Sequence, residues 1–253
     1  MGSAALTREL VAYGRELSSE GAAQLGGSFS GDARADELLE GSPNAFLLGV
    51  LFTQGIPAER AWAAPYLLLG RLGTIGAGYL ATHEREVAEA VQRPPMLHRF
   101  KNTLPRWICS MSRTLVEEYA GDATRIWPSG DHVLDVTERL GAFSGIGRKK
   151  AVMATEILVR HFGIELIGRE CGQVAYDVQV RRVFLRTGLA DEDSIEAIEA
   201  AALAACPEAP GTLDLAAWLI GRTWCRPQQP LCAACRLGGV CPRLVERNVV
   251  GVG

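Results

Sequence analysis

The sequence predicts an all-α protein, and three observations support this. Apolar residues recur at helical spacing along most of the chain, and proline or a small polar residue repeatedly precedes them. No alternation of apolar and polar residues is long enough for a sheet, although 164–167 is expected to form a short extended piece. The 253 residues are 48% hydrophobic and 22% charged, enough for one large domain or two modest ones. This composition excludes a disordered tail, a collagen and a disulfide miniprotein.

In the first half of the chain, helix boundaries are indicated by proline, serine and glycine. A helix is expected over residues 5–17, followed by a flexible Gly- and Ser-rich connection over 21–31. Ser42 and Pro43 start the next helix. The remaining signals are Pro57, which opens a helix that Pro65 is expected to break or kink, and Pro105, which precedes a helix ending at Ala120 and Gly121.

In the second half, acidic and hydroxyl residues take over as N-caps. Helices are expected after Asp131 up to Gly141, over 148–161 with Gly163 as terminator, after Asp177 up to Gly188, over 195–205 with Asp193 as cap, and over 213–221 with Thr212 as cap.

The charge pattern gives no strong global field. The formal net charge is −3, so any contact with nucleic acid must come from local patches. Residues 91–116 carry five basic residues and no acid, whereas 191–199 carry five acids and no base. No apolar stretch is long enough to span a bilayer and no signal peptide is recognisable, so we expect a cytoplasmic protein without membrane contact.

Four of the seven cysteines fall close together near the end of the chain. Cys225, Cys232, Cys235 and Cys241 have the spacing C-x6-C-x2-C-x5-C, which lets four thiolates converge on one centre. A zinc ribbon normally uses two C-x2-C pairs, but only one is present here. We therefore favour a [4Fe-4S] cluster over zinc. The scattered Cys109, Cys171 and Cys206 are expected to be small buried residues.

A second motif, Gly145-Ile146-Gly147-Arg148-Lys149-Lys150, lies between two expected helices. Two glycines two residues apart allow a tight turn with bare N–H groups, and the following helix presents its positive dipole end. Such a turn is suited to a phosphate. The motif alone is weak, because many helix-helix hairpins contain glycine.

Together, the hairpin, Asp177 before an Arg- and Val-rich helix, Gly221 to Cys225 and the four-cysteine loop resemble the endonuclease III branch of the helix-hairpin-helix DNA glycosylases. The resemblance covers about residues 42–243. It implies two helical lobes: residues 1–36 packing with the C-terminal part, a six-helix lobe over 37–161 and a C-terminal lobe over 162–253 with the cluster loop at 225–241.

The resemblance also implies roles for individual residues. Lys149 is the nucleophile and Asp177 its carboxylate partner, facing it across a cleft. Gly145, Gly147 and Arg148 hold phosphate, and Gln54 fills the gap left by the extruded base. A lysine amine attacking C1′ gives a Schiff base from which the 3′ phosphate can be eliminated, whereas water would leave an intact abasic site.

The sequence departs from the family pattern in four places. About ten extra residues, around 163–173, separate Lys149 from Asp177. Ser144 replaces the usual proline, and Asp177-Val178-Gln179 replaces Asp-Thr-His. The wedge loop opposite the lesion is replaced by residues 95–100, in which Leu97 is the candidate wedge. The last departure bears on the preference for oxidised pyrimidines.

The leading interpretation is a monomeric, nucleoid-associated bacterial-type enzyme. It would be a bifunctional base-excision DNA glycosylase and AP lyase that removes damaged, oxidised pyrimidines from duplex DNA. One alternative is a monofunctional glycosylase of other base specificity, against which Lys149 argues. Another is a non-catalytic binder of abasic or distorted DNA, favoured if the insertion displaces Asp177. An electron-transfer protein is disfavoured because no second cofactor motif is present.

Overall fold

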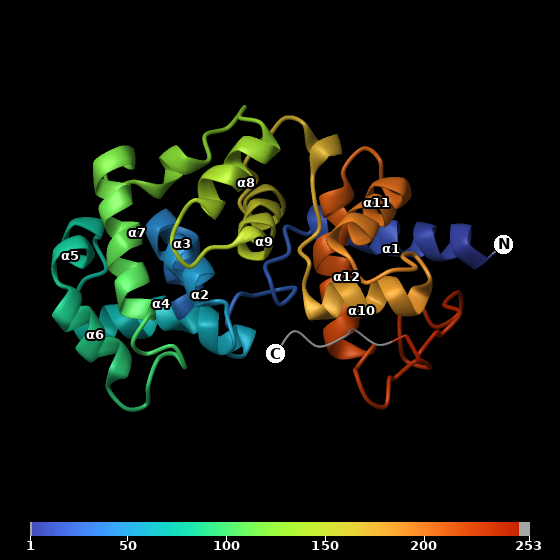
Figure 1. The fold of residues 1–253 in the computed structure, drawn as a ribbon, viewed down its shortest axis with the longest axis horizontal. Coiled ribbons are helices and arrows are strands. Elements are labelled where there is room, and N and C mark those ends of the chain that lie inside the picture. The colour runs from blue at the N-terminus through green and yellow to red at the C-terminus, as the bar shows by residue number, and fades with distance from the viewer. Residues whose placement is uncertain (1, 248–253) are drawn as a thin grey trace. The chain divides into compact units, whose positions relative to one another are not determined.

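The computed structural model describes residues 2–247, and in this range the protein consists of helices joined by turns, with no β-strand (Figure 1). The all-α prediction is confirmed. Extended pairing is limited to isolated bridges in the described part of the chain, one of which joins His132 to Ile167 at the end of the expected extended piece.

The chain divides into two compact units. Unit 1 comprises residues 1–22, 132–134 and 155–253, and unit 2 comprises 23–131 and 135–154. Unit 2 contains α2 (Ala33–Gly41), α3 (Pro43–Phe52), α4 (Ala58–Leu72), α5 (Ala77–Thr82), α6 (Glu84–Gln92), α7 (Leu104–Tyr119), the short 3₁₀ helix η1 (Ala123–Ile126) and most of α8 (Val133–Gly141). Unit 1 contains α1 (Gly2–Ser19), η2 (Arg169–Cys171), α10 (Val178–Thr187), α11 (Ile195–Ala205), η3 (Pro210–Thr212) and α12 (Leu213–Thr223). Helix α9 (Arg148–Arg160) contributes its first half to unit 2 and its second half to unit 1.

Most of the expected helix boundaries are found. Ser42 caps α3 by accepting the N–H of Ala45 at 3.2 Å, with Pro43 in the first turn. Asp177 caps α10, and Gly188 ends it in the left-handed conformation. Ala120 ends α7 with a φ of 52°.

The structure corrects three local expectations. The break that was one of the two outcomes expected at Pro65 does not occur, because α4 continues through this residue, whose side chain is buried. Ser194, not Asp193, caps α11, because the Asp193 carboxylate pairs with Arg181 instead. Thr212 precedes α12 but makes no side-chain cap.

The core of unit 2 is aromatic. Trp62 of α4 is fully buried and stacks on Phe46 of α3, with ring centroids 5.8 Å apart. Phe29 is also fully buried and lies 5.0 Å from the Trp62 ring. The Gly- and Ser-rich segment 21–31 is therefore anchored in the core by one aromatic side chain.

The core of unit 1 joins both ends of the chain. Leu10 and Leu17 of α1 pack with Phe184 of α10 and Ile220 of α12. Helix α1 approaches η3 so closely that a Cβ on Gly14 would lie 2.4 Å from the carbonyl oxygen of Thr212. Only glycine allows this approach, which seats α1 on the elements that precede the cysteine loop.

Candidate functional site

The hairpin turn of unit 2 requires glycine at its first position. Gly145 has a φ of +86°, and a Cβ there would lie 2.7 Å from the ring of Trp107 and 2.8 Å from Leu51. At Gly147, nothing lies within 4 Å of the Cβ position, and the residue is exposed directly before α9. Gly145 thus closes the turn, and Gly147 leaves the N-terminus of α9 open to an approaching anion.

The two lysines of the hairpin have opposite environments. Lys149 and Arg148 are exposed in the first turn of α9, whereas Lys150 is buried. Lys150 Nζ donates to the carbonyl oxygens of Leu51 at 2.7 Å and Gly145 at 2.9 Å. Burial and the adjacent Lys149 lower the pKa of Lys150 to about 7. The sequence contains only one other lysine, Lys101, so few side chains of this protein carry a primary amine.

Gln54 is exposed in the turn that follows α3. The turn is held by Thr53, whose hydroxyl donates to the carbonyl oxygen of Val50 at 2.7 Å, and it continues through Gly55 with a φ of +69°. A Cβ on Gly55 would lie 3.0 Å from the side chain of Arg99. Unit 2 therefore brings Gln54 next to the basic segment that was expected to hold the wedge.

The wedge assignment to Leu97 is not supported by the side chain's position. Leu97 is only 2% exposed and belongs to the core, whereas its neighbour Met96 is 41% exposed. Two arginines of α4 hold the backbone of this segment. Arg71 donates to the carbonyl oxygens of Arg93 and Pro95, each at 2.8 Å, and Arg60 donates to that of Met96. A side chain buried in the core is not available to a duplex, whereas Met96, next to Leu97, is an exposed apolar residue of this segment, as is Pro95.

Asp177 lies in unit 1, half-buried at the N-terminus of α10, where it accepts the N–H of Gln179 at 2.9 Å. The segment before it is anchored by Asp214, whose carboxylate accepts the N–H of Ala175 at 2.7 Å. Burial raises the pKa of Asp214 to about 7, although the Ala175 N–H and the nearby Arg160 act in the opposite direction.

The segment around residues 163–173, which was expected to be an insertion, is held in place within unit 1. Arg169 of η2 donates two hydrogen bonds to the buried carboxylate of Glu156 on α9, at 2.9 and 3.2 Å. A Cβ on Gly211 would lie 2.1 Å from Glu156, and one on Gly172 would lie 2.9 Å from the Arg169 carbonyl oxygen. The extra residues are therefore packed against α9 and η3.

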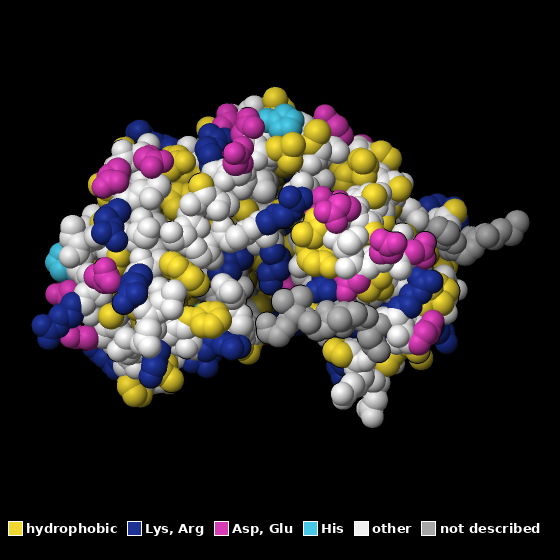
Figure 2. Space-filling model, viewed as in Figure 1, with side chains coloured by type: hydrophobic (Ala, Val, Ile, Leu, Met, Phe, Trp, Pro, Cys, Tyr) yellow, Lys and Arg dark blue, Asp and Glu magenta, His cyan; other side chains and the backbone are white. Residues whose placement is uncertain are grey.

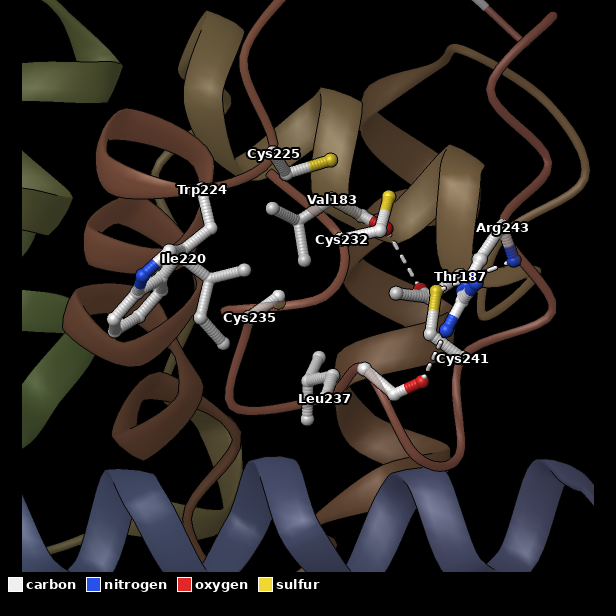
Figure 3. A pocket seen from close by; sticks show the side chains of 11 residues that line it. Val183, Thr187, Ile220, Trp224, Cys225, Cys232, Cys235, Leu237, Cys241 and Arg243 are labelled. Carbon is white, nitrogen blue, oxygen red and sulfur yellow. Dashed lines mark hydrogen bonds between the residues drawn. The ribbon is translucent and has the colours of Figure 1, made fainter. Parts of the chain in front are cut away.

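The four cysteines of the expected cluster loop line one pocket in unit 1 (Figure 3). Its apolar wall is made by Val183 of α10, Ile220 of α12 and Leu237 of the loop itself. The backbone N–H of Arg243 donates to Cys241 Sγ at 3.3 Å, and the guanidinium of Arg186 lies 4.0 Å from Cys225 Sγ. Burial raises the pKa of Cys235 and Cys241, and the N–H of Arg243 acts in the opposite direction on Cys241.

The thiol groups surround the pocket without gathering at a point. No three His, Cys, Asp or Glu side chains in residues 2–247 are close enough together to hold one metal ion. Of the other cysteines, Cys109 and Cys206 are buried as expected, whereas Cys171 is exposed in η2.

The cysteine module, defined as residues 221–247, contains several arginines that make contacts with other side chains of unit 1. Arg236 pairs with Glu16 of α1 and stacks over the Tyr13 ring, and Arg247 pairs with Asp191. On the face drawn in Figure 2, basic and acidic side chains are interspersed. The module is basic in composition, but part of that charge is neutralised within unit 1.

Sequence reasoning missed Lys150, His98 and Asp214. The helical spacing could have indicated that Lys150 is buried, because it stands four residues before Ala154 and seven before Ile157, both fully buried on α9. No comparable periodic signal marks His98 or Asp214. Within residues 2–247, every helix is too short or too polar to span a lipid bilayer.

No model of a known protein family matches the chain, and no curated protein sequence does either. Among solved structures, the fold is similar to that of endonuclease III trapped as a covalent intermediate with DNA, in an estranged-adenine complex. The TM-score is 0.60 at 20% sequence identity, and the match covers 84% of this chain and 94% of the other. A thermostable thymine-DNA glycosylase is also similar, with a TM-score of 0.57 at 14% identity over 81% of this chain and 86% of that chain. The chain therefore has the helical fold of these two DNA glycosylases, and the resemblance inferred from its motifs is confirmed at the level of fold.

Proposed function

We propose that this protein is a base-excision DNA glycosylase with AP lyase activity, acting as a monomer on duplex DNA with a damaged base or an abasic site. The observation that carries the proposal is Lys149. It is an exposed primary amine in the first turn of α9, directly after the glycine hairpin, on a fold shared with DNA glycosylases.

The proposed chemistry assigns one role to each of these residues. A stacked nucleotide must be extruded before its sugar can be attacked. In the proposed reaction Gln54 fills the gap, and Met96 takes the wedge role in place of Leu97. The Lys149 amine attacks C1′, the base leaves with the glycosidic electron pair, and the opened sugar forms a Schiff base with Lys149. Removal of a C2′ proton then expels the 3′ phosphate. Asp177 stabilises positive charge on the sugar.

We further propose that Cys225, Cys232, Cys235 and Cys241 hold a [4Fe-4S] cluster. The proposal is supported by their spacing, by the single pocket they line and by the N–H···S contact at Cys241. When bound, the cluster supplies a covalent cross-link of the loop. Purified protein is expected to contain four iron and four sulfide per chain. Cys235→Ser should lose most of both, whereas Cys171→Ser, an exposed cysteine of the same unit, should retain them. One zinc and no iron would contradict the proposal.

Borohydride trapping tests the lyase proposal. The wild type should form a covalent adduct with duplex DNA containing an abasic site, and with a duplex containing thymine glycol if oxidised pyrimidines are substrates. Lys149→Ala should abolish the adduct, and Lys101→Ala, which removes the exposed lysine outside the hairpin, should not.

The other outcomes of the trapping experiment are equally informative. An adduct with the abasic duplex alone would retain the lyase and exclude thymine glycol as substrate. No adduct from protein that still binds the abasic duplex tightly would refute the lyase and favour the non-catalytic DNA-binding interpretation.

A further inference from the structure

Lys150 joins two backbone segments of unit 2 that the proposed function uses. Its side chain is 4% exposed, and its Nζ donates to the carbonyl oxygens of Leu51 at 2.7 Å and Gly145 at 2.9 Å. Lysine is rarely fully buried unless it is paired. An apolar side chain at this position could fill the same space but could not link the two carbonyls.

The two carbonyl groups lie at the end of α3 and in the hairpin turn. Leu51 belongs to the last turn of α3, where carbonyl oxygens have no partner within the helix, and Gln54 follows three residues later. Gly145 closes the hairpin turn, two residues before Gly147. One amino group thus connects the base of the Gln54 turn to the turn proposed to hold phosphate.

His98 flanks the end of α3 as well. It is 1% exposed, its Nδ1 accepts the N–H of Phe100 at 3.0 Å, and its ring meets Phe52 edge-on with centroids 5.9 Å apart. Burial lowers the pKa of His98, and Lys150 and Arg60 lower it further, whereas the backbone of Gln54 and Phe52 acts in the opposite direction. The ionisable groups that interact electrostatically with Lys150 are therefore both basic, Lys149 and His98, and the lowered pKa favours the neutral form of His98.

This arrangement is energetically costly. Within residues 2–247, the hydrogen-bond partners of Lys150 Nζ are backbone carbonyls and not a carboxylate, so burial of the charged form carries a desolvation penalty, which is why the pKa falls to about 7. The presence of Lys150 in the core is therefore explained better by its link between the Leu51 and Gly145 carbonyls than by a gain in folding stability.

We propose that Lys150 is a positioning residue that makes the hairpin turn and the Gln54 turn move as one piece, so that gripping the phosphate also sets Gln54 for entry into the duplex. The inference rests on the proposed function, because it assumes that Gln54 enters the gap. Lys150 itself touches no DNA in this scheme.

The test uses the full-length protein and a duplex with tetrahydrofuran, an abasic analogue that no amine can cleave. A 2-aminopurine opposite the tetrahydrofuran becomes brighter when a side chain enters the gap and unstacks it. The variants are Lys150→Met, Gln54→Ala, the double variant and Lys101→Met as the control for loss of one lysine charge. Affinity and 2-aminopurine brightness are both measured.

We expect Lys150→Met to lose the fluorescence rise and to bind the tetrahydrofuran duplex roughly tenfold more weakly. The double variant should bind no more weakly than either single variant, because both remove the same event. Lys101→Met should keep the full fluorescence rise. Lys150→Gln, which retains an N–H₂ donor, should recover part of the signal even if Lys150→Met is poorly folded.

Two results would overturn the inference while leaving the proposed function intact. These are a full fluorescence rise in Lys150→Met, and independent, multiplying losses of affinity in the double variant. A borohydride adduct that maps to Lys150 instead of Lys149 would overturn both the inference and the assignment of Lys149 as nucleophile. If the wild type does not prefer the tetrahydrofuran duplex over undamaged DNA, the proposed function itself fails and takes the inference with it.

Discussion

Gly145 and Gly147 stand two residues apart in the hairpin, yet only Gly145 is enclosed by other side chains. A methyl group at Gly145 would collide with Trp107 and Leu51 and would occupy a backbone conformation that L-residues disfavour. Gly145→Ala is therefore expected to lower the free energy of unfolding by about 2–4 kcal/mol.

Gly147→Ala is the matched control for this substitution. It should change the free energy of unfolding by no more than about 0.5 kcal/mol, because its Cβ meets open space. It should nevertheless weaken binding to an abasic duplex several-fold, by crowding the N–H groups that are proposed to bind the phosphate. Urea unfolding measures the change in stability, and a DNA titration measures the change in affinity. Equal destabilisation by both substitutions would contradict the conclusion that only position 145 requires glycine for packing.

Lys150 should also give the protein a specific pH dependence. Its folded-state pKa is about 7 against an ordinary value of 10.5, so between these pH values the unfolded chain binds the proton and the folded chain does not. The contribution of this residue to the free energy of unfolding therefore rises with pH across that window, by up to about 1.4 kcal/mol per pH unit.

Urea unfolding of the wild type and Lys150→Met at pH 6, 7.5 and 9 tests this. Groups that titrate equally in both proteins cancel, so the stability of the wild type relative to the variant should rise with pH. A constant difference at all three values would show that Lys150 has an ordinary pKa.

At the scale of elements, the start of α12 supports the segment that leads to Asp177. Asp214 in the first turn of α12 accepts the N–H of Ala175 in a fully buried position. Asp214→Ala leaves that N–H without its partner and should lower the free energy of unfolding by about 1–3 kcal/mol. Asp214→Asn retains an oxygen acceptor and should cost less. Hydrogen exchange at the Ala175 amide should accelerate in the alanine variant, and an unchanged rate would refute the assignment.

The boundaries of elements were predictable where a single residue determines them. Ser42 with Pro43, Asp177 and Gly188 act through their own backbone geometry or side-chain oxygen, so local sequence is sufficient. Asp193 could not be distinguished from Ser194 as a cap, because its carboxylate is used by an arginine 12 residues away. Tertiary pairing overrides local preference there.

The candidate site was predictable to a similar degree. The glycine hairpin and the cysteine loop are contiguous motifs, and their local structure follows from their spacing. The sequence could not predict that Leu97 is buried and Met96 exposed, because two adjacent apolar residues in a loop have no periodic pattern that distinguishes them. Asp214 was also hidden, since its partner Ala175 lies 39 residues away.

At the scale of the whole molecule, the two units draw on different parts of the chain. Unit 2 is nearly continuous, whereas unit 1 combines residues 1–22 with 155–253. Cys235→Ser is expected to accelerate hydrogen exchange in the cysteine loop and in α10 and α12, which form its pocket, and to leave the aromatic core of unit 2 unchanged. Cys171→Ser should alter neither. Equal acceleration in both units would show that they unfold together.

The position of α1 in unit 1 has a consequence for synthesis. Its apolar residues Leu6, Leu10 and Leu17 are buried in the finished protein, and its partner α12 begins at Leu213, almost 200 residues later. At ribosomal rates this is a delay on the order of 10–40 s. Throughout that time α1 exposes an apolar face, and unit 2, which follows α1 in the chain, can fold before α1 is covered. Helix α1 is thus made before the elements that bury it, and it is a segment of the nascent chain that a chaperone would bind.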